Sequence, residues 1–195
     1  MSINIRVTAR LTMATFGLSA MAIGAPPIGM MNWVTHPIMN DGDRATMVSF
    51  VNSSKSPSIA GGWVVQEIAD TIQGGANYAH ADSFVQAMDD AGVHLSLNYG
   101  NTDWNGSTTD VNQNVTVILT YLDNCNATLS TNVINGSPTI DVNLDVEPKG
   151  GTTTQQWISM LSQVRALLDT HNAGSPKVKA TLSAFVPMSV QDDME

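Results

Sequence analysis

The sequence predicts an α/β fold in which a parallel sheet carries its helices on the outside, in the manner of an incomplete (β/α) barrel of the TIM type. Two observations lead to this expectation. Short segments with the apolar, β-branched composition of strands recur along the chain, and amphipathic helical segments separate them. Each connection is also long enough to be a crossover helix, and such crossovers join parallel strands.

The predicted elements alternate along the chain. Strands are expected over residues 28–35, 59–65, 93–99, 140–147 and 178–186. Helices are expected over residues 44–52, 79–92, 111–122 and 152–171. Gly92 ends the second of these helices, and the last carries an apolar stripe that includes Trp157 and Leu168. Residues 66–75 fit neither pattern, and residues 101–107 are predicted to form a polar loop.

Two architectures satisfy this order, an open doubly wound sheet and a (β/α) barrel. No GxGxxG motif follows the first strand and no GxxxxGK[ST] motif occurs, which weakens the nucleotide-binding versions of the open sheet. A full barrel takes about 250 residues, whereas this chain has 195. We therefore expect residues 26–195 to form a partial barrel, and we expect the chain to be a fragment with weak or no activity.

The first 25 residues have the order of a secretory signal. Arg6 and Arg10 precede a run of apolar and small residues over 11–23, which contains the small residues Ala20 and Ala22. The run is too short to span a bilayer comfortably. We therefore expect a cleaved signal peptide over residues 1–25, a secreted extracellular protein and no membrane span. An ordinary buried helix or a wrongly assigned start codon is the alternative.

Charge and cysteine content exclude several classes of function. The 17 acidic and 8 basic residues give a net charge of −9. A chain this acidic should not follow a phosphate backbone, so we expect no nucleic-acid partner. Cys125 is the single cysteine, which excludes an internal disulfide and a CxxC redox motif. His80, His94 and His171 lack the spacing of metal ligands, and no cofactor is predicted.

The strand predicted over residues 140–147 is polar on one face. Side chains alternate between faces along a strand, so Asp141, Asn143, Asp145 and Glu147 lie opposite an apolar set. In a barrel the last two would meet at the mouth, about 6–7 Å apart along the strand. Two carboxylates at this range raise the pKa of one of them, as acid–base catalysis requires. Two other interpretations remain open, namely the solvated face of an edge strand and a cation site.

The segment IDVNLDVEP resembles the fourth-strand motif of barrel glycoside hydrolases, and most closely that of the family 18 chitinase-like group, DxxDxDxE. Glu147 matches the terminal Glu and Asp145 the Asp before it, whereas Asn143 and Ile140 stand where the family has Asp. The resemblance implies that Glu147 is the general acid. It also implies that Asp145 orients the substrate acetamido group, which attacks the anomeric carbon. A conventional pair of carboxylates from two different strands is the other possibility.

We therefore predict a secreted glycoside hydrolase whose substrate is a polysaccharide or oligosaccharide. Besides the two acids, the candidate substrate-binding residues are Asn143, Asn98 and Tyr99 on predicted strands, and Trp33 and Trp104 as sugar-stacking platforms. For both tryptophans the competing interpretation is a place in the hydrophobic core. The alternative functions are a non-catalytic carbohydrate-binding or surface protein with the same fold, and a metal-dependent phosphodiesterase.

Overall fold

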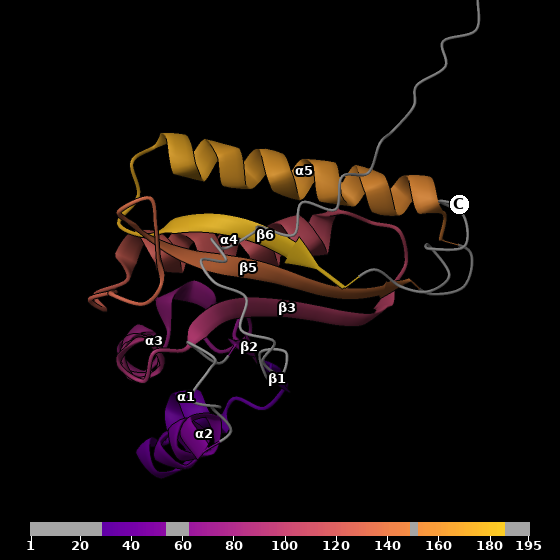
Figure 1. The fold of residues 1–195 in the computed structure, drawn as a ribbon. Helices are drawn as coiled ribbons and strands as arrows, with labels where there is room; N and C mark the ends of the chain where they lie inside the picture. The colour runs from indigo at the N-terminus through magenta and orange to yellow at the C-terminus, as the bar shows by residue number, and fades with distance from the viewer. Residues whose placement is uncertain (1–28, 54–62, 149–151, 186–195) are drawn as a thin grey trace, which may run out of the picture.

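A parallel sheet forms the centre of the protein. The computed structural model describes residues 29–53, 63–148 and 152–185. Five of its strands run parallel and pair in chain order, as Figure 1 shows: β1 (Gly29–Asn32), β2 (Trp63–Glu67), β3 (His94–Trp104), β5 (Ser137–Pro148) and β6 (Lys179–Ala184). The two-residue strand β4 (Val133–Ile134) pairs antiparallel with the start of β5.

This topology confirms the predicted α/β class with a mainly parallel sheet. Each parallel strand lies beside the one that precedes it, without the reversal of a doubly wound sheet. The sheet does not close on itself among the described residues, so a complete TIM barrel is not observed. β5 lies between β3 and β6, and the interpretation of residues 140–147 as an edge strand is therefore wrong.

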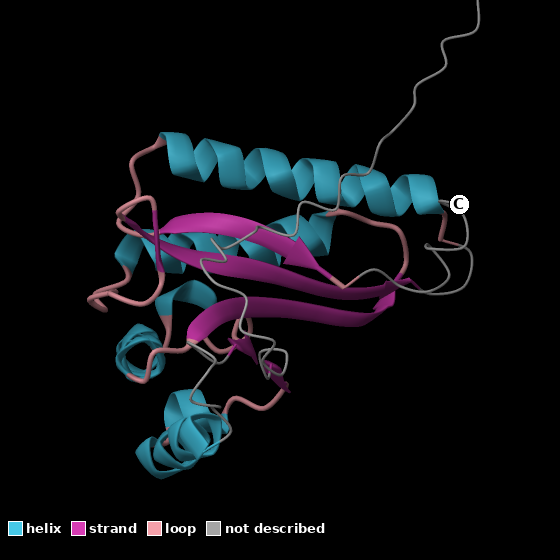
Figure 2. Cartoon of the chain, in the orientation of Figure 1, coloured by secondary structure: helices cyan, strands magenta, loops and turns pink. Residues whose placement is uncertain are grey.

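Helices occupy the connections between the strands (Figure 2). They are α1 (His36–Met39), α2 (Asp41–Ser53), α3 (Tyr78–Asp90), α4 (Thr109–Asn124) and α5 (Thr154–Ala173), with a short 3-10 turn, η1 (Gln73–Gly75), before α3. α5 begins with a capping box, because the Thr153 hydroxyl accepts from the Gln156 N–H and the Gln156 side chain accepts from the Thr153 N–H. This cap fixes where the chain enters the helix after β5.

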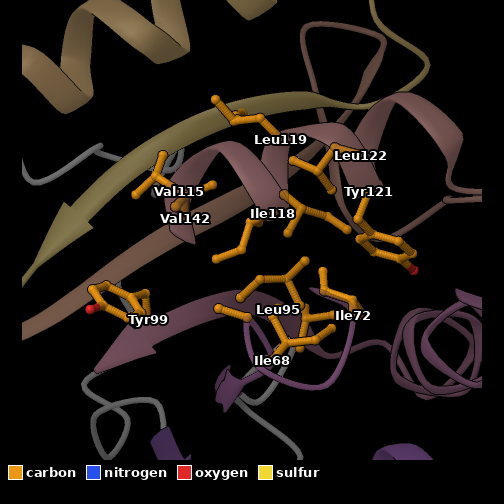
Figure 3. Close-up of a cluster of buried hydrophobic side chains, with 14 of the residues drawn as sticks. Ile68, Ile72, Leu95, Tyr99, Val115, Ile118, Leu119, Tyr121, Leu122 and Val142 are labelled. Carbon is orange, nitrogen blue, oxygen red and sulfur yellow. The ribbon is translucent and has the colours of Figure 1, made fainter. Parts of the chain in front are cut away.

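One hydrophobic core joins these helices to one face of the sheet. Alternate residues of β5, namely Ile140, Val142, Leu144 and Val146, are buried on this face. Figure 3 shows Val142 of β5 beside Val115 of α4, with Ile118 of α4 between Val142 and Leu95 of β3. As predicted, the alternation along β5 therefore separates an apolar face, packed in the core, from a polar face.

Asp89, near the end of α3, fastens the segment that leads to β4. Its carboxylate accepts from the backbone N–H groups of Ser130 at 2.6 Å, Thr131 at 3.0 Å and Asn132 at 2.8 Å. Burial alone would raise the pKa of Asp89, but these hydrogen bonds outweigh it and hold the pKa below its usual value. The ionised carboxylate thus acts as a structural anchor.

Several element boundaries differ from the predictions. β3 continues to Trp104, so the polar loop expected over 101–107 is wrong for its first four residues, 101–104. β2 ends at Glu67, two residues later than expected. The predicted helix over 111–122 is confirmed as α4 and is longer than expected. The predicted signal peptide over residues 1–25 lies outside the described residues, as do the predicted strand residues 59–62 and 186.

Candidate active site

The face of the sheet opposite the core carries a continuous set of polar side chains. Partners in a parallel register point to the same face. Asn98 is in register with Glu67, Asn143 and, through Asn143, with Ser183. This polar face includes Glu67, Ser96, Asn98, Gly100, Asp141, Asn143, Asp145, Glu147, Thr181 and Ser183.

Asp141 organises the part of the polar face nearest the strand beginnings. Its carboxylate accepts from the hydroxyls of Ser96 at 2.7 Å, Thr181 at 3.0 Å and Ser183. The Trp63 indole N–H extends the network by donating to Ser96 Oγ at 2.7 Å. Burial raises the pKa of Asp141, although the three hydroxyl donors oppose that rise. With three hydroxyl donors already on its oxygens, Asp141 links β3, β5 and β6 rather than offering itself to a ligand.

Glu67 ends β2 and reaches towards the next strand. Its Oε2 accepts from Asn98 Nδ2 and from the Gly100 N–H, both at 2.9 Å. Burial raises the pKa of Glu67 to about 7, against the hydrogen bonds from Asn98, Gly100 and the Ala69 backbone, while the charge of Asp70 adds to the rise. A carboxyl with this pKa holds a proton over part of the neutral range, as general acids require.

Trp33 follows β1 and covers Gly100. A Cβ atom at position 100 would lie 2.5 Å from Cζ3 of the Trp33 indole and 3.4 Å from Oε2 of Glu67. Only glycine therefore lets the indole and the carboxyl approach this point of β3 together. Trp33 remains 48% exposed, so part of the residue is available to a ligand.

Asp145 and Glu147 lie on the polar face near the carboxyl end of β5. They are two residues apart in a regular strand, which places both side chains on the same face. Asp145 is half-buried and Glu147 is exposed. The pKa of Asp145 is raised, first by burial and then by the negative charge of Glu147. The structure thus brings together the two carboxyls that the sequence singled out.

Two buried amides line the same face one row closer to the strand beginnings. Asn98 is fully buried and Asn143 is 4% exposed. Asn98 donates from Nδ2 to Glu67, and Asn143 donates from Nδ2 to Ser183 Oγ at 2.7 Å. Neither Oδ1 atom has a hydrogen-bond donor among the described residues. Both amides thus leave an acceptor unused, which is costly in a buried position.

Tyr99 and Trp104 lie elsewhere, which corrects their proposed place in the site. Tyr99 is adjacent to Asn98 in the chain and therefore points to the opposite face, where Figure 3 shows it in the hydrophobic cluster near Leu95. Trp104 is 1% exposed and its indole N–H donates to the Ser107 carbonyl. Both side chains belong to the core, so neither is available as a sugar platform.

Glu67 is the residue of this site that the sequence did not indicate. The strand before it was predicted to end at Val65, and Glu67 fell in the stretch 66–75 that fitted neither the strand nor the helix pattern. The available signal was the alternation of Trp63, Val65 and Glu67, which continues one strand face to an acidic last residue.

Comparisons with known proteins give no relative. No family model matches the chain, and neither the curated proteins nor the solved structures contain a match.

Within the described ranges, no three His, Cys, Asp or Glu side chains gather in a way that could hold a metal ion, so these residues supply no ligand set for the cation-site interpretation. No helix in the same ranges combines the length and apolar character needed to cross a membrane.

Proposed function

We propose that this protein is a carbohydrate-active hydrolase that cleaves a glycosidic bond at the carboxyl-end edge of the polar face. The observation that carries the proposal is the presence of carboxyls from β2 and β5 on one face there, beside the exposed ring of Trp33. Ligands of parallel α/β proteins bind outside the carboxyl ends of the strands. The partial barrel layout and secretion directed by residues 1–25 belong to the same proposal.

Asp145 and Glu147 supply the reactive carboxyl pair of β5. The sequence motif assigns the acid role to Glu147 and a supporting role to Asp145. Glu147 is exposed and can reach a bound sugar, while burial and the neighbouring charge favour a proton on Asp145. Trp33 offers a flat apolar surface for a sugar ring, and Asn98 and Asn143 offer hydrogen-bonding groups.

The test is hydrolysis of a panel of polymeric and oligomeric glycans by the wild type and by Glu147→Gln. We expect weak turnover by the wild type, loss of that turnover in the variant by roughly 10²–10⁴-fold, and unchanged glycan binding. Asp169→Asn is the matched control, because Asp169 is exposed on α5, where it forms an ion pair with Arg165. Equal turnover by wild type and Glu147→Gln would refute the assigned role.

A non-catalytic carbohydrate-binding protein is the second candidate function. The exposed Trp33 ring and the two buried amides favour it, since none of these groups requires acid–base chemistry. In this case the wild type and Glu147→Gln would bind the same glycan equally and neither would release product. The same panel therefore separates the two functions.

A further inference from the structure

We propose that Glu67 is a further catalytic carboxyl of this site, which acts across Gly100 from the β5 carboxyls on a sugar whose hydroxyl groups donate to Asn98 and Asn143. This inference rests on the proposed hydrolase function and deepens it. It favours a conventional pair of carboxyls from two strands over attack by a substrate acetamido group.

The register places Glu67 at a suitable separation from β5. Its Oε2 lies 2.9 Å from the Gly100 nitrogen, and Gly100 is the register partner of Asp145. Neighbouring strands are about 4.8 Å apart, so a carboxyl that contacts Gly100 lies about one strand spacing from the backbone of Asp145. The two catalytic carboxyls of glycoside hydrolases are likewise close neighbours, about 5–9.5 Å apart.

Gly100 lets the Trp33 ring pack directly against β3 beside these carboxyls. A Cβ atom at position 100 would lie 2.5 Å from the ring and 3.4 Å from Oε2 of Glu67. A ligand held against the exposed part of Trp33 therefore lies next to the Glu67 carboxyl, with Asp145 on the register partner of Gly100. An aromatic ring beside an acid is a suitable setting for binding a sugar next to its proton donor.

The two unused amide oxygens indicate what kind of ligand fits. Asn98 directs its nitrogen towards Glu67 on β2, and Asn143 directs its nitrogen towards Ser183 on β6. Their Oδ1 atoms have no donor among the described residues, and Asn98 and Asn143 are register partners on neighbouring strands. Two unused acceptors need a donor such as a hydroxyl or an N–H and do not suit an anionic group.

The proton balance follows from the surroundings of the carboxyls. Glu67, partly buried under Trp33, is the group that keeps a proton near neutral pH. It gives this proton to the glycosidic oxygen as the bond between that oxygen and the anomeric carbon breaks. A water oxygen bonds to the anomeric carbon, and a carboxylate of the Asp145–Glu147 pair takes the proton that the water loses. These roles reverse those that the chitinase-like motif implies for Glu147.

The experiment compares leaving groups. Wild type, Glu67→Gln and Glu147→Gln are assayed on oligosaccharides and on 2,4-dinitrophenyl glycosides, whose leaving group needs no proton. Glu67→Gln should lose roughly 10²–10⁴-fold on oligosaccharides and far less on the dinitrophenyl glycosides. Glu147→Gln should lose turnover on both. Glutamine keeps an oxygen that can accept from Asn98 and Gly100, so a purely structural role of Glu67 would not produce this difference.

A second measurement uses the wild type, in case Glu67→Gln does not fold. The chain has three glutamates, Glu67, Glu147 and Glu195, so carboxyl carbon signals in a 13C-glutamate-labelled protein are few enough to assign. The titration midpoint of Glu67 should coincide with the alkaline limb of the pH profile of turnover. Suppose that the wild type is active but the titration midpoint of Glu67 differs from the alkaline limb, or that Glu67→Gln loses equally on both kinds of leaving group. Either result overturns only the role of Glu67. Failure of the wild type on every glycan and glycoside overturns the hydrolase proposal itself.

Discussion

Replacing Glu67 by glutamine should change how the stability of the protein depends on pH. Burial raises the pKa of Glu67 from 4.5 to about 7 in the folded protein, so at intermediate pH the folded state binds a proton that the unfolded chain has released. The wild type should therefore lose stability as pH rises from 4.5 to about 7, and the loss should level off above that. At about 1.36 kcal/mol for each pH unit, this interval corresponds to up to about 3 kcal/mol.

The assay is urea unfolding at a series of pH values, followed by far-UV circular dichroism. The free energy of unfolding of Glu67→Gln minus that of the wild type should increase by up to about 3 kcal/mol across this pH range. His94, whose pKa burial lowers, changes stability in the opposite direction, but it does so in both proteins and cancels in the difference. Any hydrogen bond lost on substitution adds a constant offset. A difference that stays constant with pH would refute the reasoning.

Three further predictions concern other parts of the described structure. Gly100→Ala should displace the Trp33 ring, because the new Cβ would lie 2.5 Å from it, and a tryptophan fluorescence spectrum identical to that of the wild type would contradict this. Asp89→Ala should lower the free energy of unfolding by about 3–5 kcal/mol in urea, because the backbone donors of Ser130, Thr131 and the buried Asn132 all lose their acceptor; a loss under about 1 kcal/mol would argue against the anchor. Cys125 is buried and burial raises the pKa of its thiol, so it should react with a thiol reagent far more slowly in the folded protein than in urea.

The sequence predicted the parts of the fold that depend on local periodicity. The alternation over residues 140–147 correctly separated buried Val142 and Leu144 from the polar face. The apolar stripe containing Trp157 and Leu168 correctly predicted the buried side of α5. These patterns are visible in one segment at a time, because a strand or helix face is defined by spacing along the chain.

The remaining features depend on contacts between distant segments. Gln66 and Glu67 fell in a stretch that fitted neither the strand nor the helix pattern. Gln66 is nevertheless buried, and its side chain forms hydrogen bonds with Asn32 of β1 and with the Val34 carbonyl. Tyr99 was predicted to bind substrate because of its aromatic ring, but the alternation of side chains along β3 places it on the core face of the sheet. The proximity of Glu67, Gly100 and Trp33 depends on the register of three strands, which no single segment encodes.

The pairing of each parallel strand with the one before it has a consequence for biosynthesis. When a strand leaves the ribosome, the strand with which it pairs has already been synthesised. The sheet can therefore grow one strand at a time from β1 towards β6. Each new strand has to close only one crossover connection before it pairs, which limits the loop-closure entropy of each step. The Glu67 carboxyl of β2 is made before the Asp145 and Glu147 carboxyls of β5, so the polar face is complete only after most of the described chain has been synthesised.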